Sequence, residues 1–182
     1  MPDFQKGQYM SKIILASKSP RRIELLKMCN INFNSLVADI DEDLIKSDIL
    51  ATFKEENTFE QAEILTKKLA YEKALYIYKE NPDHLVIGSD TLVVTDKSIL
   101  GKPKDPQDAY IMLRELSGQV HRVYTGVSII GPGYENTFVS IAQVKFYDFD
   151  PAMDQIIIDY IASGSPMDKA GGYGIQDMGA LL

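Results

Sequence analysis

The feature that most constrains the fold is a helix start that occurs three times: a residue that caps helix N-termini stands directly before a proline. Such a pair places the cap just outside the helix and the proline at its first position, where a missing amide proton is tolerated. The pairs are Ser19-Pro20, Asp105-Pro106 and Asp150-Pro151. They predict helices over 20–29, from 106 to a stop at Gly118, and over 151–163.

Apolar runs of strand length lie between these helices, and a longer helical pattern over 58–79 ends before Pro82. The last two runs flank the turn residues 131–133 and predict a hairpin. The predicted strands are residues 12–16, 31–37, 85–95, 120–130 and 137–147. Early alternation of strands and helices, followed by an antiparallel pair, predicts an α/β fold with a mixed sheet.

Size and composition narrow the class of protein. With 182 residues, 45% of them hydrophobic, we expect a flexible leader over 1–11 and a single domain over 12–182. The net charge of −7 argues against binding to a nucleic acid polymer, although a small anionic substrate remains compatible. Cys29 has no partner for an internal disulfide. No apolar run approaches the ~20 residues of a membrane span, so we expect a soluble cytoplasmic protein with no membrane partner.

A polar segment over 17–22 joins the first predicted strand to the first helix. Free backbone amides and the helix dipole favour an anion at such a junction, and helical side chains lean toward it. Cations in the first turn are unfavourable by themselves. We therefore interpret Arg21 and Arg22, with Ser17 and Ser19, as candidate phosphate-binding residues. The alternative is a capped helix with two solvated arginines.

Lys73 stands out on the helix predicted over 58–79. At about 100° per residue it falls within an apolar stripe that includes Leu65, Leu69 and Ile77. A buried ammonium is costly unless an anion meets it, which makes Lys73 a candidate for a charged site. A lysine that extends past its neighbours to water is the alternative.

Asp90 lies in the middle of an apolar strand that we expect to be interrupted at 88–90. Such an aspartate persists when it is paired, binds a metal or acts as a base; the alternative is one that accepts backbone hydrogen bonds at a strand break. Gly88 indicates a bulge or a close backbone approach. Glu42, in the acidic stretch 39–43 that we expect to be a loop, is a second candidate ligand for Mg²⁺, unless it is simply solvated.

Two other segments carry weaker signals. Lys102 stands beside a rigid proline and could contact a phosphate or be solvated, but its surroundings lack the residues of a phosphate loop. Gln176 ends a glycine-rich stretch, and its amide can pair with a nucleobase edge; a tight turn is the alternative. His84 and His121 lack the spacing of a zinc-binding pair.

Taken together and in this order, these segments resemble the Maf family, the septum-formation-inhibitor proteins, which are nucleoside triphosphate pyrophosphatases. The resemblance extends from about residue 12 to residue 176. The matching motifs are Ile14-Leu15-Ala16-Ser17-x-Ser19-Pro20-Arg21-Arg22, Asp39-x-Asp41-Glu42, Glu72-Lys73-Ala74, Gly88-x-Asp90-Thr91, Leu100-Gly101-Lys102-Pro103, Leu116-Ser117-Gly118-x-x-His121-x-Val123-x-Thr125-Gly126 and Asp168-Lys169-Ala170-Gly171-x-Tyr173-Gly174-Ile175-Gln176.

The resemblance implies an ITPase-like fold, in which an elongated, twisted mixed sheet is flanked by helices and two lobes surround a cleft. It implies cleavage of a nucleoside triphosphate to the monophosphate and pyrophosphate, assisted by Mg²⁺ or Mn²⁺. Asp90, Glu42 and Lys73 would form the catalytic group, with Asp90 and Glu42 also holding the metal. The implied phosphate-binding residues are Arg22, Lys73 and Lys102. The positions that match those setting base preference in the dTTP/UTP branch are Arg21, Thr91 and Gln176.

Two departures from the family pattern bear on these expectations. Asp177 stands where the family usually has a small residue, which places negative charge beside the expected base pocket. Family members also generally continue beyond the position of Leu182 into another strand and a closing helix. We expect residues 180–182 to begin a strand whose uncovered edge favours association, and therefore a homodimer.

Two other functions compete with pyrophosphatase activity. A nucleotide-binding regulator of cell division with little turnover has less need of the carboxylates of Asp90 and Glu42. A phosphopeptide-binding module that uses Arg21 and Arg22 would leave Asp90 and Lys73 unexplained. The sequence therefore favours an enzyme of nucleotide-pool housekeeping that prefers dTTP and UTP.

Overall fold

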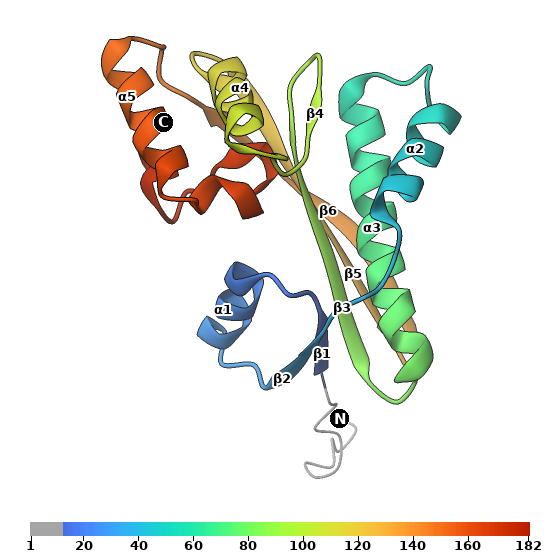
Figure 1. Cartoon of the computed structure of the whole chain (residues 1–182). Coiled ribbons are helices and arrows are strands. Elements are labelled where there is room, and N and C mark those ends of the chain that lie inside the picture. The colour runs from blue at the N-terminus through green and yellow to red at the C-terminus, as the bar shows by residue number, and fades with distance from the viewer. Residues whose placement is uncertain (1–12) are drawn as a thin grey trace, which may run out of the picture.

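A computed structural model describes residues 13–182, so the predicted leader over 1–11 lies outside the described residues. Its sheet has the strand order β2-β1-β3-β5-β6, with the short β4 paired to β3 (Figure 1). The strands are β1 Ile13–Ala16, β2 Phe33–Leu36, β3 Leu85–Val94, β4 Ile99–Leu100, β5 Val120–Gly131 and β6 Tyr134–Lys145. β1 pairs in parallel with β2 and β3, whereas β3, β5 and β6 are antiparallel. The predicted mixed α/β sheet is confirmed.

Helices begin at each of the three predicted prolines. The α-helices are α1 Pro20–Met28, α2 Glu42–Thr52, α3 Thr58–Glu80, α4 Pro106–Leu116 and α5 Pro151–Ala162. Three short 3₁₀ helices follow: η1 Ser165–Asp168, η2 Ala170–Gly172 and η3 Met178–Leu181. Asp105 and Asp150 accept the expected capping hydrogen bonds, but the Ser19 side chain makes none with the described residues. Its hydroxyl therefore remains available for another partner.

The prediction that residues 39–43 form a loop was wrong at its C-terminal end. Glu42 opens α2 because the Asp41 side chain accepts a hydrogen bond of 2.9 Å from the Leu44 amide. Acidic residues in the first turn also suit the helix dipole. Ile45 and Ile49 then pack against the core beneath α3. The spacing of these two isoleucines is the signal by which the helix could have been found.

Helix α3 lies directly against the middle of the sheet, as Figure 1 shows. A Cβ atom at Gly88 would lie 2.7 Å from the Ala74 amide nitrogen, and one at Gly126 would collide with the backbone of Thr66. Of the two alternatives predicted for Gly88, a bulge or a close backbone approach, the structure shows the close approach. The predicted interruption at 88–90 is not present, because β3 runs without a break from Leu85 to Val94.

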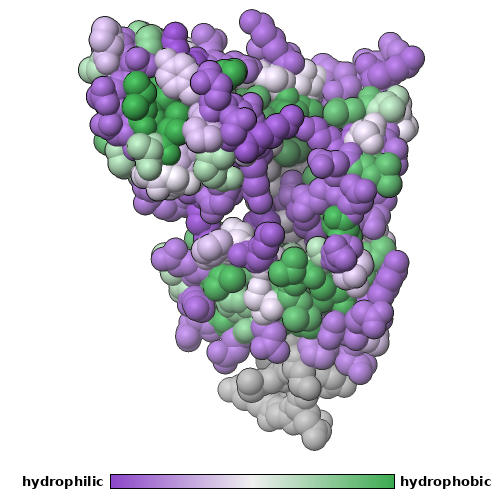
Figure 2. Space-filling model, viewed as in Figure 1, coloured by the Kyte–Doolittle hydropathy of each residue, from purple (hydrophilic) through white to green (hydrophobic). Residues whose placement is uncertain are grey.

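The register of β3 divides the molecule into two lobes. β1 pairs with β3 only as far as Ala16 opposite Gly88, and the pairing of β3 with β4 starts only at Val93, which lies opposite Leu100. Residues 89–92 therefore have no strand on that side. Separate apolar clusters lie at the two ends of the strand, one under α4 and α5 and one between β1 and α3. Figure 2 shows the surface hollowed between the two lobes, with a largely hydrophilic rim. The expected cleft between two lobes is present.

The prediction that residues 180–182 begin a strand was wrong. Residues 178–181 form η3, because the Asp177 side chain accepts a hydrogen bond of 2.9 Å from the Gly179 amide. Leu182 is buried, and its carbonyl oxygen accepts a hydrogen bond of 2.7 Å from the Tyr147 amide. The argument for association through a strand at this point therefore does not hold.

Within residues 13–182, none of the helices combines the length and the apolar character that a membrane crossing requires.

Candidate active site

The candidate site lies where β3 has no neighbouring strand, between the two lobes. The edge at residues 89–92 is approached by the first turn of α1 from one lobe and by the glycine-rich segment around 168–177 from the other. This arrangement brings together residues that are far apart in the sequence.

Three charged side chains meet on the α3 side of this edge. Lys73 Nζ lies 2.6 Å from Asp90 Oδ1 and 3.1 Å from Glu42 Oε2. The Lys73 side chain is 11% exposed and the Asp90 side chain 12%, whereas Glu42 is half-exposed. Lys73 is thus a buried, paired ammonium, and the alternative of a lysine that reaches water is wrong.

The surroundings of Asp90 affect its protonation. Burial raises the pKa of Asp90, while the charge and hydrogen bond of Lys73 and the charge of Arg22 act in the opposite direction. The net direction is upward, which makes the carboxylate a better proton acceptor than an exposed aspartate. A group of this kind suits a general base.

The donor set at this point also suits a hard divalent cation. Asp90 and Glu42 contact the same ammonium, so one carboxylate oxygen of each lies within 3.1 Å of Lys73 Nζ. Residues 13–182 contain no group of three or more His, Cys, Asp or Glu side chains that could hold a metal. Mg²⁺ commonly takes one or two carboxylates together with substrate phosphates and water. Two protein carboxylates therefore fit a metal that binds with its substrate.

Arg22 crosses from α1 to β3. Its Nη1 donates a hydrogen bond of 2.7 Å to the Ser89 carbonyl oxygen, and its Nη2 donates one of 3.1 Å to Thr91 Oγ1. Burial lowers the pKa of Arg22, while the charges of Asp90 and Glu42 raise it; the guanidinium remains protonated at neutral pH. The arginine therefore brings positive charge to the unpaired edge of β3.

Ser17 and Ser19 form the turn that precedes α1. Ser17 is buried, and its hydroxyl oxygen accepts hydrogen bonds from the Ser19 amide at 3.1 Å and from Arg22 Nη1 at 3.5 Å. No acidic side chain lies in the first turn of α1. The helix N-terminus and its arginines thus offer positive electrostatic potential to an anion.

Arg21 points toward the other lobe. Its Nη2 donates a hydrogen bond of 3.3 Å to the Asp168 carbonyl oxygen, and its Nη1 lies 3.7 Å from Asp168 Oδ1. Burial alone would raise the pKa of Asp168, but the hydrogen bond and charge of Lys169, followed by the charges of Arg21 and Lys102, lower it. These contacts connect the two lobes across the cleft.

The other predicted residues fall in three places around this arrangement. Thr91 lies on the cleft edge itself, 3.4 Å from Thr125 through their hydroxyl oxygens. Lys102 is exposed in the loop after β4, and that loop is joined to η2 by the hydrogen bond from the Gly171 amide to the Gly101 carbonyl oxygen. Gln176 is exposed in the turn before η3. The structure thus groups Asp90, Glu42, Lys73, Arg22, Thr91 and Ser17 closely. Arg21 reaches from α1 toward the opposite wall of the cleft, the lobe that carries Lys102, Asp168 and Gln176.

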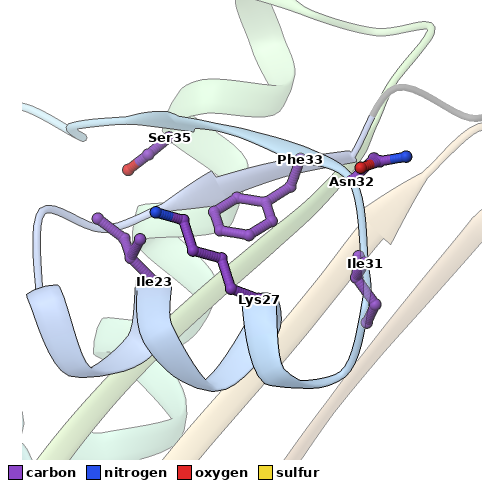
Figure 3. Close-up of a pocket in the computed structure, with 6 residues that line it drawn as sticks. All are labelled: Ile23, Lys27, Ile31, Asn32, Phe33 and Ser35. Carbon is purple, nitrogen blue, oxygen red and sulfur yellow. The ribbon is translucent and has the colours of Figure 1, made fainter.

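A pocket of about 310 Å³ lies between α1 and β2. Figure 3 shows Lys27 of α1 extending over Phe33 of β2, with Ser35 nearby. Ser35, which lines this pocket, donates a hydrogen bond of 2.5 Å from its Oγ to the Ser17 carbonyl oxygen and so stabilises the turn before α1. It carries a single lysine and no carboxylate, and it does not include the candidate catalytic residues.

The sequence analysis missed the residues that stabilise the lobe opposite α1. Asp168 and Lys169 lay within a quoted motif, but nothing in the sequence indicated that Asp168 would contact Arg21. Tyr160 belongs to an apolar helix pattern and gave no signal of a polar role, although its hydroxyl bonds to Asp177. The Asp177 carboxylate, expected to add charge beside the base pocket, is engaged by Tyr160, Ser165 and Lys169.

Comparison with known proteins shows the family of this chain. A family model described as Maf-like protein matches residues 12–182. A dTTP/UTP pyrophosphatase of Geobacillus sp. (strain WCH70) is 45% identical over 95% of this chain and 85% of its own length. Proteins of the same name from Thermosipho africanus and Aquifex aeolicus are 44% and 41% identical, each over 94% of this chain and over 80% and 82% of their own lengths.

Among solved structures, that of the Staphylococcus aureus Ham1 protein superposes with a TM-score of 0.45 and 17% sequence identity. The superposition covers 75% of this chain and 72% of that one.

Proposed function

This chain belongs to the Maf family, and from that premise we propose that it hydrolyses a nucleoside triphosphate to the nucleoside monophosphate and pyrophosphate, with dTTP and UTP preferred. The observation that carries the proposal is the Lys73 ammonium held between Asp90 and Glu42 beside an unpaired strand edge. Relatives that cover most of this chain bear the name dTTP/UTP pyrophosphatase. The cellular role would be housekeeping of the nucleotide pool.

In the proposed reaction the triphosphate lies along the cleft beside residues 89–92. Arg22, Ser17, Ser19 and the amides that open α1 would bind phosphate oxygens, with Lys102 approaching from the opposite wall. Lys73 would hold the phosphates and keep Asp90 in position. These groups neutralise the charge of the phosphates, and positioning of this kind accounts for much of the catalysis of phosphate-ester and anhydride cleavage.

Asp90 would act as the general base. Its carboxylate accepts a proton from the attacking water, the water oxygen bonds to the α-phosphorus, and the bond to the bridging oxygen breaks so that pyrophosphate leaves. A divalent cation held by Asp90 and Glu42 would supply charge neutralisation at the phosphates when bound. The two carboxylates that contact one ammonium, and so lie close together, support this part of the proposal.

Base preference is assigned to the opposite wall. Gln176 offers an amide that can pair with the adjacent carbonyl and N–H of thymine or uracil, and Arg21 and Thr91 would contact the adjoining part of the nucleotide. Arg21 lies close to the Gly174 turn, because a Cβ at Gly174 would be 3.4 Å from Arg21 Nη1. This proximity supports a joint role for Arg21 and the turn that carries Gln176.

Location and assembly complete the proposal. We place the reaction in the cytoplasm, where nucleoside triphosphates are made and consumed. We also propose a homodimer, because the edge strand β6 exposes Phe138 and Ile141 at 44% and 48% and such an edge can pair with a second copy. Light scattering of the purified protein at high concentration tests the dimer, and a monodisperse monomer would contradict it.

The deciding experiment is a panel of nucleoside triphosphates with Mg²⁺ or Mn²⁺, in which pyrophosphate and orthophosphate are assayed separately. We expect pyrophosphate and a monophosphate as the first products, with dTTP and UTP the best substrates by kcat/KM and no turnover after chelation. Orthophosphate together with a nucleoside diphosphate would overturn the reaction type. Tight nucleotide binding without turnover would favour the regulator instead.

A further inference from the structure

The turn that carries Gln176 is closed by one buried hydroxyl group. Tyr160 of α5 has no exposed surface, and its hydroxyl oxygen accepts a hydrogen bond of 3.2 Å from the Gly174 amide. The same hydroxyl donates a hydrogen bond of 2.9 Å to Asp177 Oδ1. A single side chain from the core thus binds both ends of the segment Gly174–Asp177, whose two central residues are Ile175 and Gln176.

Backbone contacts tighten the same turn. The Asp177 amide lies 3.5 Å from the Gly174 carbonyl oxygen, as in a four-residue turn, and a Cβ at Gly179 would lie 2.9 Å from the Gly174 amide nitrogen. Ile175 is 68% exposed although its neighbours Gly174 and Tyr173 are buried. The tip therefore projects from a base that is held inside the lobe.

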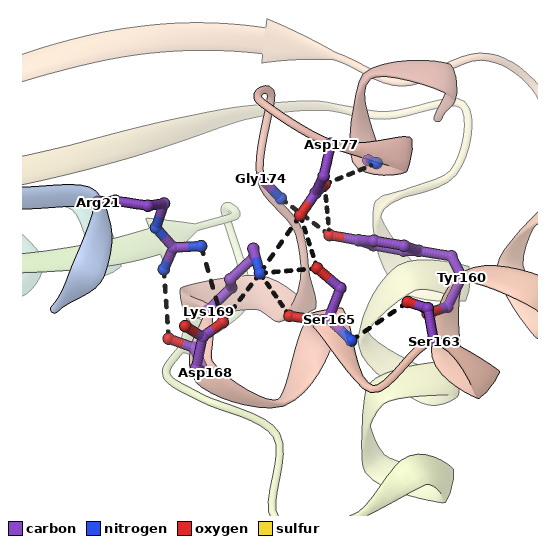
Figure 4. A network of polar contacts seen from close by, with 9 residues as sticks. Arg21, Tyr160, Ser163, Ser165, Asp168, Lys169, Gly174 and Asp177 are labelled. Carbon is purple, nitrogen blue, oxygen red and sulfur yellow. Dashed lines mark hydrogen bonds and ion pairs between the residues drawn. The ribbon is translucent and has the colours of Figure 1, made fainter. Parts of the chain in front are cut away.

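The Asp177 carboxylate connects this base to a charged network, shown in Figure 4. Its second oxygen accepts a hydrogen bond of 2.7 Å from Ser165 Oγ and lies 3.3 Å from Lys169 Nζ. Lys169 also donates a hydrogen bond of 2.9 Å to Asp168 Oδ1, and Asp168 in turn contacts Arg21. The network thus runs from the core tyrosine to the arginine that reaches across the cleft.

We propose that Tyr160 and Asp177 are positioning residues for nucleotide selectivity: the tyrosine hydroxyl and the carboxylate clamp the Gly174–Asp177 turn so that Gln176 and Arg21 are held at a constant distance. This inference rests on the proposed function, since it assigns base selection to that turn. Neither residue needs to touch the nucleotide. The clamp limits the conformations of the Gln176 backbone, and preorganisation of that kind reduces the entropy lost on binding.

The clamp is tested with Tyr160→Phe, which keeps the ring in the core and removes only the hydroxyl. Tyr110→Phe is a matched control, because Tyr110 donates a hydrogen bond of 2.7 Å to Asp154 Oδ1 between α4 and α5, away from the turn. Hydrogen exchange of the Gly174 and Asp177 amides, which are the hydrogen-bonded amides of the turn, is measured first because it requires no turnover. We expect exchange there to increase at least about tenfold in Tyr160→Phe and to be unchanged in Tyr110→Phe.

The second readout is the ratio of kcat/KM for dTTP to that for dATP. We expect Tyr160→Phe to move this ratio about tenfold toward unity, as the loss of one well-formed hydrogen-bonded contact would. The change should appear in KM, with kcat for the better substrate within about twofold of wild type, because the base contact forms in the ground state. A wild-type enzyme that prefers purines would refute the proposed base preference, but a shifted ratio in Tyr160→Phe would still support the clamp.

Asp177 variants test the clamp from its other side. Asp177→Ala should reproduce the change in selectivity, and Asp177→Asn, which keeps an acceptor oxygen for the hydroxyl, should restore part of it. Because both residues act through one hydrogen bond, the double variant Tyr160→Phe/Asp177→Ala should be less impaired than the sum of the single effects. Unchanged exchange and an unchanged ratio in Tyr160→Phe, or an equal change in Tyr110→Phe, would overturn the proposal.

Discussion

The ammonium of Lys73 lies 2.6 Å from the Asp90 carboxylate and thereby joins the middle of α3 to the middle of β3. Both side chains are almost fully buried, so each charge offsets part of the free-energy cost of burying the other. The pair stands at the point where Gly88 and Gly126 allow the helix to approach the sheet backbone. Close packing of helix and sheet is therefore a condition for this charged contact.

Asp90→Asn keeps the shape of the side chain and removes its charge. We expect kcat to fall by ~10²-fold or more, as for the loss of a principal catalytic group, because the amide can neither accept the proton nor neutralise a cation. Steady-state kinetics with saturating Mg²⁺ and a thermal unfolding curve measure the two effects. Near-normal turnover in a folded Asp90→Asn variant would remove Asp90 from the mechanism.

Lys73→Met should abolish the charge that holds Asp90 and Glu42 together, and we expect kcat to fall by ~10²-fold. Lys67→Met is a matched control on the same helix, since Lys67 also contacts a carboxylate, Glu63, at 2.6 Å but is 41% exposed. A surface pair of that kind contributes about 0–1 kcal/mol, so activity and stability should hardly change. Equal losses in the two variants would show that Lys73 has no special role.

Arg22→Lys preserves the charge but not the fork that reaches Ser89 and Thr91 together. Because a lysine cannot donate to both acceptors in that planar geometry, we expect KM for the triphosphate to rise by about tenfold, equivalent to one hydrogen bond to a charged group. Initial rates over a range of substrate concentration give the result. A KM equal to that of wild type would argue that Arg22 only holds β3 and α1 together.

His121 makes stability depend on pH. It is 1% exposed, its Nε2 lies 2.7 Å from the Tyr173 hydroxyl oxygen, and burial lowers its pKa to about 4. In the unfolded chain the histidine has its ordinary pKa of about 6.5. As the pH falls, the unfolded chain therefore binds a proton at His121 before the folded protein does. The contribution of neutral His121 to the free energy of unfolding is therefore fully present above about pH 6.5. It is lost as the pH falls toward the folded-state pKa of about 4.

His121→Phe removes the titratable imidazole and keeps an aromatic ring beside Phe146 and Tyr173. Between pH 7 and pH 5 we expect wild type to lose about 2 kcal/mol more of its unfolding free energy than the variant does, from the linkage relation for this pKa difference. Urea denaturation at the two pH values measures the difference. Parallel losses in both proteins would contradict the assignment.

Much of the fold could be predicted from local signals in the sequence. The capping residue and proline pairs located the starts of α1, α4 and α5, because a cap acts on amides only two or three residues away. Lys73 and Asp90 could be singled out because each places a charge where the helical or strand period requires an apolar residue. The sequence thus determined which two residues form the buried charged pair, which the structure places 2.6 Å apart.

Partners that are distant in the chain were decided only by the tertiary structure. The unpaired edge of β3 exists because its pairing with β1 ends at Gly88 and its pairing with β4 starts only at Val93, which is a matter of register between strands. Arg21 contacts Asp168, 147 residues away, and the Tyr160 hydroxyl closes a turn on another segment. Such contacts depend on how the lobes pack around the sheet, and no local propensity or period in the sequence encodes that packing.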